Sequence, residues 1–428
     1  MRFKILKYIT TFFITTACII SPLCIKAFSG EVDILVQKLM DKGILTPGEA
    51  QQIVTETKEE VRLDLAKGES PSVPKWVQNT KLKGDVRLRY QWQKQDTGTS
   101  QKATNRQRGR LRYRLGLETK INDKAKVGVG IASGTGDPRS TNVTFQNAFE
   151  HPSIRLDYAY AQYAPLASTT LVGGQIYNPI WRTDDLLWDS DINPQGIAMQ
   201  FDWSSYPNVN LFTNAGFFVL DEASGYNADP VMWVVQPGIN WKATDKVNLK
   251  GSFNYYGFNG LIGKLLDYRS SPATNTVATD PRGGYLYNYD SYGATAEIGF
   301  QEPLGTNGVF AQLPYVGVFG DYIHNPDPPS GDRDGWLIGG KIGYAKVGKS
   351  KEWQAKYMYR KLEKDAWLDV LPDSDFYGGA TDVKGHEVVF EYGLMDNVIF
   401  AMDYYNAQRL SGDKRTENLF QADVTFKF

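Results

Sequence analysis

Hydrophobic and polar residues alternate with a period of two along most of the chain after Trp76. In the first such segment, KLKGDVRLRYQWQ, the apolar residues take one parity and the charged residues take the other. Leu88 and Arg89 show this alternation at its centre. Such a pattern is typical of a β-strand with one apolar and one polar face. The sequence therefore predicts an all-β region from Trp76 to Phe428.

Sixteen segments share this alternation, and most are about as long as a tilted strand needs to be to cross a membrane, roughly 9–11 residues. The predicted strands lie near 81–93, 107–119, 124–132, 154–164, 169–177, 196–203, 209–219, 232–242, 247–258, 289–300, 312–323, 335–346, 352–361, 384–394, 398–407 and 418–428.

The links between these strands alternate between mostly short and mostly long ones, with 259–288 and 363–383 among the long ones. Transmembrane β-barrels are built with short periplasmic turns and long extracellular loops. The fifth short link, around 301–311, is longer than this pattern requires, which leaves the strand register there poorly defined.

A sheet that spans a bilayer must close on itself, because the bilayer offers no water to the backbone groups at a sheet edge. We therefore predict a closed antiparallel transmembrane β-barrel of about 16 strands, with a short N-terminal helical segment. Trp233 and Trp241 lie at opposite ends of one apolar face, as interfacial aromatic girdles require. A soluble β-solenoid or sandwich is the alternative. In such a fold, tryptophans would be scattered and would not lie on the same face of the strands.

The first 27 residues are expected to form a secretory signal peptide. Basic residues precede an apolar stretch at 9–25, and Ala27 offers a small residue at the expected cleavage site. A permanent membrane anchor is the alternative, which Pro22 within the short apolar run disfavours. Both cysteines, Cys18 and Cys24, lie in this segment, so the exported chain would contain no disulfide.

Residues 31–67 have helical periodicity, and Thr46 and Glu49 form a capping box at the start of a second helix. The domain boundaries that we predict are a signal peptide at 1–27, a periplasmic helical segment with its linker at 28–75, and an outer-membrane barrel at 76–428. The helical segment could serve as an oligomer contact or a cell-wall contact, or simply pack under the barrel as a hairpin.

Composition and net charge argue against two classes of protein, helical membrane proteins and nucleic-acid-binding proteins. A mean hydropathy of −0.40 excludes a bundle of membrane helices. The full chain has a formal net charge of −1, and losing the four basic residues of the signal peptide lowers it by four to −5. A mildly acidic chain of this kind is not expected to bind nucleic acid.

Basic residues occupy one face of the first two predicted strands, and leucine and tyrosine take the opposite parity. A charged side chain that faces hydrocarbon at mid-depth would cost about 2–4 kcal/mol. The basic face must therefore point into the lumen, where like charges are tolerated only if water fills the space. The predicted pore-lining basic wall consists of Lys83, Arg87, Arg89, Arg108, Arg110, Arg112 and Arg114.

The third long loop, Asn178–Gly196, is too apolar for a loop in solvent, since it contains Trp181 and Trp188. We predict that this loop folds into the barrel and opposes its acids to the basic wall across a constriction, which sets the solutes that pass. A surface loop packed against a neighbouring subunit or loop is the alternative. The charged residues of the predicted constriction loop are Arg182, Asp184, Asp185, Asp189 and Asp191.

The same loop begins like a calcium-binding loop, with Asp189, Asp191 and Asn193 at the right spacing. Pro194 replaces the glycine that the sharp turn requires, and Gln200 replaces the closing glutamate, so an EF-hand is excluded. An irregular calcium site remains an alternative.

Three motifs together resemble the putative porin family of Gram-negative bacteria: WVQNTKLKGDVRLRY at 76–90, WRTDDLLWDSD at 181–191 and DKGILTPGEA at 41–50. The resemblance extends from Val32 to Phe428. It implies an outer-membrane barrel, exported through its signal peptide, for the passive diffusion of ions and small hydrophilic solutes, and no cofactor is expected. General porins are often trimers, which makes a homotrimer possible, although they lack the helical segment.

The last segment, FQADVTFKF, resembles the C-terminal strand of bacterial outer-membrane proteins, in which the final phenylalanine is recognised by the barrel-assembly machinery. Outer-membrane lipid and this machinery are therefore expected partners.

Two other classes of function compete with a general porin. An outer-membrane enzyme is disfavoured, because none of His151, His324 and His386 can be placed with a serine and an acid on one wall. An adhesin or phage receptor would use the long loops. Within transport, an anion- or substrate-selective channel is the alternative, since arginines suit phosphate and carboxylate groups.

Overall fold

The computed structural model describes residues 35–66, 75–96, 104–222, 228–269, 274–279, 283–305, 313–412 and 414–428. The expected signal peptide and the expected linker at 70–74 lie outside these residues. The chain divides into two units, one ending at Gln78 and the other beginning at Asn79, and each is described by itself.

The N-terminal unit is helical. Residues 35–41 are helical, and α2 (Pro47–Ala66) and α3 (Lys75–Gln78) follow. The capping box predicted before α2 is present: the backbone N–H of Thr46 donates to Glu49 Oε2 over 2.9 Å, and that of Glu49 donates to Thr46 Oγ1 over 3.4 Å. Among the described residues, no helix has both the length and the apolar character needed to cross a membrane.

The second unit is a single sheet of seventeen strands. The strands are β1 (Thr80–Gln95), β2 (Thr104–Lys120), β3 (Ala125–Ser133), β4 (Val143–Thr144), β5 (Ile154–Leu166), β6 (Thr169–Gln175), β7 (Gln195–Tyr206), β8 (Val209–Val219), β9 (Val231–Lys242), β10 (Val247–Asn259), β11 (Ser291–Gln301), β12 (Tyr315–His324), β13 (Asp334–Gly343), β14 (Trp353–Leu362), β15 (Val383–Met395), β16 (Val398–Arg409) and β17 (Thr416–Lys427).

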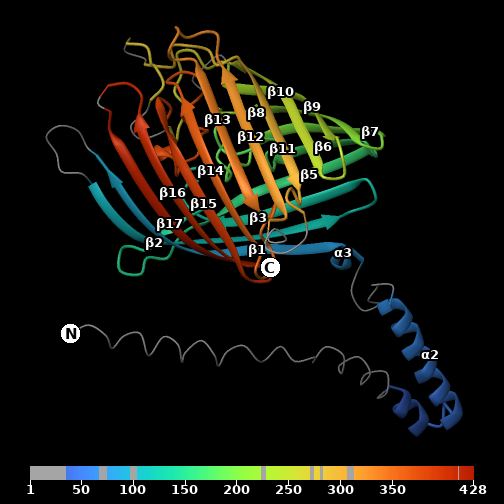
Figure 1. Ribbon diagram of the computed structural model, residues 1–428. Helices are drawn as coiled ribbons and strands as arrows, with labels where there is room; N and C mark the ends of the chain where they lie inside the picture. Colours follow the sequence, from blue (N-terminus) through green and yellow to red (C-terminus); the bar gives the residue numbers. More distant parts are fainter. Residues whose placement is uncertain are drawn as a thin grey trace. The chain divides into compact units, whose positions relative to one another are not determined.

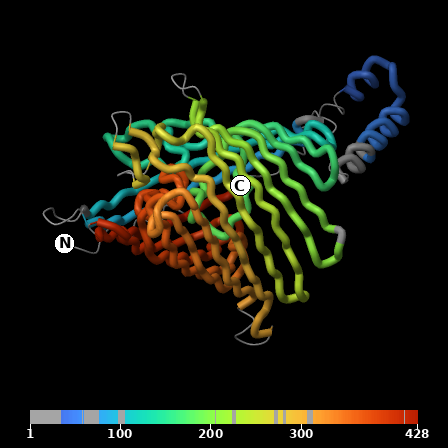
Figure 2. Tube along the Cα trace, turned by 90° about the horizontal axis from the view of Figure 1, so that it is seen from above, coloured from blue at the N-terminus to red at the C-terminus, as the bar shows by residue number. Residues whose placement is uncertain are grey.

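The sheet closes because β1 pairs with β2 on one side and with β17 on the other. All of the pairings between strands are antiparallel, and Arg89 lies opposite Arg110 of β2 and Asp423 of β17. Figures 1 and 2 show the first and last strands of the barrel lying side by side. The predicted closed antiparallel barrel of sixteen strands is confirmed, with β4 as an additional two-residue strand that pairs with β2 beyond the end of β3.

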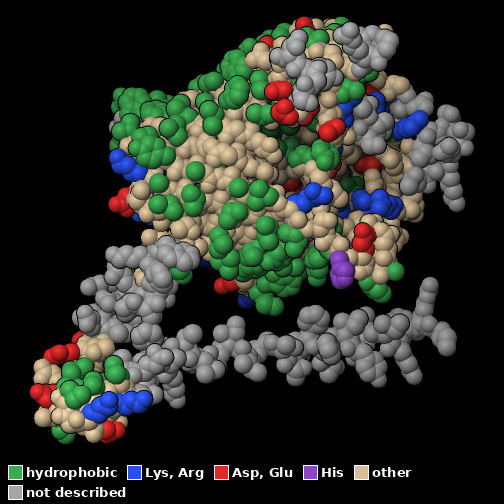
Figure 3. All heavy atoms as spheres, turned by 180° about the vertical axis from the view of Figure 1, so that it is seen from behind, with side chains coloured by type: hydrophobic (Ala, Val, Ile, Leu, Met, Phe, Trp, Pro, Cys, Tyr) green, Lys and Arg blue, Asp and Glu red, His purple; other side chains and the backbone are tan. Residues whose placement is uncertain are grey.

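The outward-facing parity of the strands is apolar. Leu88, Val318 and Ile338 are 48%, 46% and 56% exposed, and hydrophobic side chains gather over broad areas of the outer wall (Figure 3). Such a surface is stable only where lipid rather than water covers it. The period-two alternation in the sequence therefore has its cause in a wall with lipid on one side and the lumen on the other.

Short links gather at one end of the barrel and long loops at the other. Links 167–168, 207–208 and 396–397 have two residues each, whereas loops 134–153, 176–194, 260–290 and 363–382 are long. The fifth short link lies between β11 and β12, and β12 begins at Tyr315, three residues after the predicted start. The predicted start at 312 lies outside the described residues.

Two of the long loops fold back inside the barrel and build a hydrophobic core there. Trp188 of loop 176–194 and Trp367 of loop 363–382 are 2% and 0% exposed, and their ring centroids lie 6.4 Å apart. Tyr256 of β10 packs against Trp367 at 4.7 Å. The core thus joins both loops to the inner face of the wall, and it determines where the charged residues between them can lie.

Candidate pore constriction

Loop 176–194 is fixed to the inner wall at Trp181. Gln236 of β9 is fully buried; its Oε1 accepts from the Trp181 backbone N–H over 2.8 Å, and its Nε2 donates to the Trp181 carbonyl over 2.6 Å. Gln236 Nε2 also donates to Asn254 Oδ1 over 2.7 Å, and Lys250 Nζ lies 4.3 Å from the centroid of the Trp181 ring. One amide side chain therefore satisfies both backbone groups of Trp181, which fixes the position of the loop.

Loop 363–382 holds the other end of loop 176–194. The Asp189 backbone N–H donates to the Leu371 carbonyl over 2.7 Å, and Asp189 Oδ2 accepts from the Ser374 backbone N–H over 2.8 Å. The indole N–H of Trp367 donates to the Leu187 carbonyl over 2.7 Å. The two loops therefore position each other and act as one unit inside the barrel.

A third loop supports this unit through buried carboxylates. Asp369, which is fully buried, accepts from the Thr274 backbone N–H over 2.7 Å and lies 3.3 Å from Arg269 Nε. Asp365 accepts from both the backbone N–H and the hydroxyl of Thr276, over 2.7 and 2.6 Å. A buried carboxylate needs such donors to stay in place. These contacts fix loop 363–382 to the described residues of loop 260–290.

From the sequence, residues 363–383 were predicted only as a long loop, and their inward position was not predicted. The signal was present, since AWLDVL at 366–371 is as apolar as the part of loop 176–194 that suggested an inward fold. Its acids, Asp373 and Asp375, are the ones that reach the charged residues of the wall.

Four arginines of the predicted basic wall lie beside carboxylates inside the barrel. Arg89 donates from Nε and Nη2 to Asp423, both over 2.8 Å, and from Nη1 to Asp375 over 2.9 Å. Arg87 donates from Nη2 to Asn142 Oδ1 over 2.7 Å and lies 3.6 Å from Asp423. Arg89 is thereby joined both to the wall and to loop 363–382.

Arg112 and Arg114 share one carboxylate of the neighbouring strand. Their Nε atoms donate to Asp85 over 2.9 and 2.7 Å. Arg114 Nη1 also lies 3.5 Å from Asp191, the predicted acid of loop 176–194 that comes closest to the basic wall. Asp191 in turn accepts from the backbone N–H and the hydroxyl of Thr141, each over 3.0 Å.

The structure does not bring the other members of the basic wall to the loop acids. Lys83 lies 2.7 Å from Glu118 and 4.9 Å from the centroid of the Tyr177 ring. Arg110 donates to Gln91 over 3.1 Å, and neither Arg110 nor Arg108 has a carboxylate within 4 Å among the described residues.

The other acids of loop 176–194 face β14, four strands from β1 around the barrel. Asp184 lies 2.5 Å from Lys356, and Asp185 lies 3.2 Å from Arg360. Arg360 also pairs with Glu387 of β15 and lies 3.5 Å from Asp373. Arg182, the base of the predicted set, has no ion-pair partner within the part of the chain that the structure describes.

A cavity of about 210 Å³ lies among these charges. Its charged lining includes the bases Arg87, Arg89, Arg112 and Lys356 and the acids Asp184, Asp185, Asp191, Asp373, Asp375, Glu387 and Asp403. We call this space the constriction. A field that crosses the lumen from arginines to carboxylates orients charged and dipolar solutes.

The pKa values of the loop acids differ strongly. Burial, and then the carboxylate of Asp184, raise the pKa of Asp185 to about 8 against the opposing effect of Arg360. Burial also acts to raise the pKa of Asp184, but Lys356 and Arg360 outweigh it and lower the pKa to about 2. Burial and the neighbouring Asp185 raise the pKa of Asp373 well above its usual range. Near neutral pH, Asp184 is therefore charged, whereas Asp185 carries its proton most of the time.

One group of carboxylates is close enough to share a metal ion. Among the described residues, Asp185, Asp373 and Glu387 have oxygens within 4.8 Å of one another. The guanidinium of Arg360 contacts all three, so a positive charge already neutralises the position that a cation would need. The calcium alternative for Asp189, Asp191 and Asn193 is also disfavoured, because protein donors engage Asp189 and Asp191 while Asn193 donates to Asp157 over 2.9 Å.

The family is established by its sequence model. The model of the putative porin family matches residues 93–317 and 307–428, which together span most of the barrel and more than half of the chain. The chain belongs to the putative porin family. This family and the closed barrel point to a channel of the bacterial outer membrane rather than to an enzyme.

Among solved structures, the barrel is similar to a triple mutant of the porin of Rhodopseudomonas blastica, with 12% identity, a TM-score of 0.43, and coverage of 82% of this chain and 100% of that one. The outer-membrane channel DcaP of Acinetobacter baumannii shares 14% identity, with a TM-score of 0.45 over 82% of this chain and 97% of that one. Both TM-scores are low, so the evidence for the closed barrel is the pairing of β1 with β17 and not these matches. Among curated proteins, none matches the chain.

Proposed function

We propose that this protein is a porin that forms a water-filled channel for the passive diffusion of ions and small hydrophilic solutes. The observation that carries the proposal is the constriction, a polar cavity of about 210 Å³ lined by basic and acidic side chains, inside a closed barrel. Unpaired charges and half-neutralised clusters such as Asp185, Asp373 and Glu387 need water beside them, because burial in a dry interior would be costly.

The pairing of the charges favours a mixed field over the alternative of an anion-selective channel. Arg89, Arg112 and Arg114 are each within hydrogen-bonding distance of a carboxylate, so little free positive charge remains on that side. On the other side, Arg360 alone is shared by Asp185, Asp373 and Glu387. We therefore expect weak selectivity that shifts toward cations when these acids ionise.

The described histidines support a channel rather than an enzyme. His324 Nδ1 lies 2.7 Å from Asp334, and His386 Nδ1 lies 2.8 Å from the hydroxyl of Tyr357. Neither of these two, nor His151, has a serine as hydrogen-bond partner within the described ranges, so a nucleophile activated by histidine is not assembled there.

The remaining elements of the proposal concern location and partners. Outer-membrane lipid would cover the apolar outer wall, and the barrel-assembly machinery would recognise β17 with its terminal Phe428. The helical segment at 28–75 would lie in the periplasm after cleavage of the signal peptide, where contacts between α2 helices would suit a homotrimer. A role of the long loops in adhesion or phage binding is compatible with transport.

A liposome-swelling assay with the purified protein tests this proposal. We expect swelling in isotonic solutions of uncharged sugars, at rates that fall steeply as the sugar becomes larger. Liposomes with heat-denatured protein serve as the control. Native protein that inserts but gives no swelling with any solute, together with no ionic current, would contradict a water-filled channel.

A further inference from the structure

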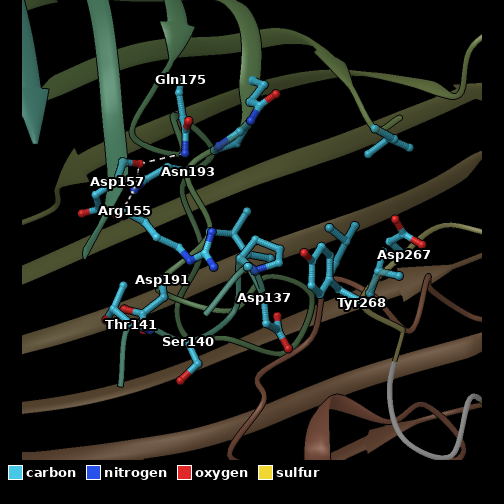
Figure 4. A pocket seen from close by; sticks show the side chains of 18 of the residues that line it. Asp137, Ser140, Thr141, Arg155, Asp157, Gln175, Asp191, Asn193, Asp267 and Tyr268 are labelled. Atoms are coloured by element: carbon cyan, nitrogen blue, oxygen red, sulfur yellow. Dashed lines mark hydrogen bonds between the residues drawn. The ribbon is translucent and has the colours of Figure 1, made fainter. Parts of the chain in front are cut away.

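A second and larger cavity lies at the long-loop end of the barrel, beside the constriction. Its volume is about 570 Å³, and Figure 4 shows side chains converging on it from β5, from loop 134–142, from loop 176–194 and from the segment at 267–268. We call it the outer cavity. Asp191 lines both the outer cavity and the constriction, so the two are neighbours inside the barrel.

The outer cavity combines an apolar surface with charges of both signs. Tyr268 lines the cavity and is 50% exposed, so its ring provides apolar surface. Trp188 and Phe218 also line the cavity, but they are only 2% and 1% exposed and pack edge to face with centroids 6.5 Å apart. Arg155 and Asp267 are charged and also line the cavity. Pockets of about 300–1,000 Å³ with an apolar lining and a few polar groups are typical of small-molecule sites.

Arg155 differs from the arginines of the constriction. Its side chain reaches from β5 toward the middle of the outer cavity (Figure 4), and it forms no hydrogen bond or ion pair with any residue that the structure describes. Arg89, Arg112 and Arg114 each have a carboxylate partner. An arginine with all its donors directed at water is well placed to bind a planar carboxylate in two parallel hydrogen bonds.

Carboxylates of the same cavity are also available. The side chains of Asp221 and Asp267 have no described ion-pair or hydrogen-bond partner, and among the described residues the carboxylate of Asp157 accepts only from Asn193. Charges of both signs therefore line one cavity without neutralising each other, since Arg155 lies within 4 Å of none of these acids. A ligand that carries both charges would satisfy both sides.

We propose that the outer cavity binds small zwitterions with an apolar side group, of the size of an amino acid, before they enter the constriction. The carboxylate of the solute bonds to Arg155, its ammonium group faces the acids, and its side group lies against the exposed ring of Tyr268. A singly charged anion would meet an excess of carboxylates, and a singly charged cation would leave Arg155 unpaired. This inference rests on the proposed porin function and names its preferred solute class.

Blockade of the single-channel KCl current tests the site in the full-length protein. L-phenylalanine should interrupt the current in a concentration-dependent way, and it should do so at lower concentration than its anionic analogue N-acetyl-L-phenylalanine or its cationic analogue L-phenylalaninamide. Arg155→Gln should weaken the blockade by L-phenylalanine roughly 10- to 100-fold, the value of a hydrogen bond to a charged group. Asp267→Asn should also weaken it.

The KCl conductance itself separates failure of the site from failure of the channel. A stable stepwise KCl current in Arg155→Gln shows that the variant has folded and inserted, and the matched control Arg333→Gln, outside the outer cavity, should keep the wild-type blockade. Equal blockade by all three probes, or undiminished blockade in Arg155→Gln, would overturn the zwitterion site while leaving the porin function intact. Absence of any KCl current in the wild type would contradict the porin function and, with it, this inference.

Discussion

At the scale of single residues, Asp185 is a loop acid of the constriction whose charge responds to pH near neutrality. Burial and the carboxylate of Asp184 raise its pKa to about 8, so it is mostly neutral at pH 6 and mostly ionised at pH 9. Ionisation adds negative charge beside Asp373 and Glu387, which share Arg360 with it. Asp184, with its pKa near 2, stays charged throughout this range.

We therefore predict that the channel becomes more cation-selective as the pH rises from 6 to 9. The measurement is the reversal potential of the channel under a KCl gradient at each pH. Asp185→Asn should behave like the wild type at pH 6 and lose a large part of the shift at pH 9. Asp245→Asn, which removes an acid from a short link at the other end of the barrel, should retain the full shift.

Contacts between individual charged residues could not be predicted from the sequence. Period-two alternation indicated which residues share the face of Arg89, but not which carboxylates they meet. Asp423 and Asp375 lie 334 and 286 positions further along the chain. Closure of the barrel brings Asp423 to Arg89, and the fold of loop 363–382 brings Asp375 to it. The local pattern of apolar and polar residues indicates neither contact.

At the scale of elements, Gln236 is the residue that fixes loop 176–194 to the wall, because it bonds to both backbone groups of Trp181. Gln236→Leu would leave a backbone N–H and a carbonyl without partners, at a cost of about 1–3 kcal/mol for each buried group. We predict that this variant shows larger and noisier single-channel conductance than the wild type, because the loop leaves its position part of the time.

Gln421→Leu is a matched control for this prediction. Gln421 of β17 is fully buried, and its amide atoms have no hydrogen-bond partner among the described residues, so the same change there frees no loop. Identical current noise in the two variants would contradict the role given to Gln236.

The sequence predicted the long strands, but it predicted neither the shortest strand nor the contact between the two inward loops. All sixteen long strands were predicted, since each has a lipid face that enforces alternation. The two-residue β4 was missed because it is too short to show a period. The partnership between loops 176–194 and 363–382 was missed because an apolar run in a loop indicates burial without indicating against what it packs.

At the scale of the whole molecule, closure of the barrel depends on pairing between its first and last strands. Leu88 of β1 lies opposite Val424 of β17. We predict that cysteines placed at both positions form a disulfide under mild oxidation, identified by mass spectrometry of the linked peptides. A pair at Leu88 and Val318, on β1 and β12, should form none. Efficient linkage of the control pair, or none between 88 and 424, would contradict the observed register.

Single-channel recording of the purified full-length protein in a planar bilayer measures whether the polar constriction inside this barrel conducts ions. Under a KCl gradient at neutral pH, we expect stable stepwise currents with a reversal potential close to zero, because the arginines and the ionised acids at the constriction nearly balance. Correctly folded and inserted protein that gives no current steps would contradict a conducting constriction.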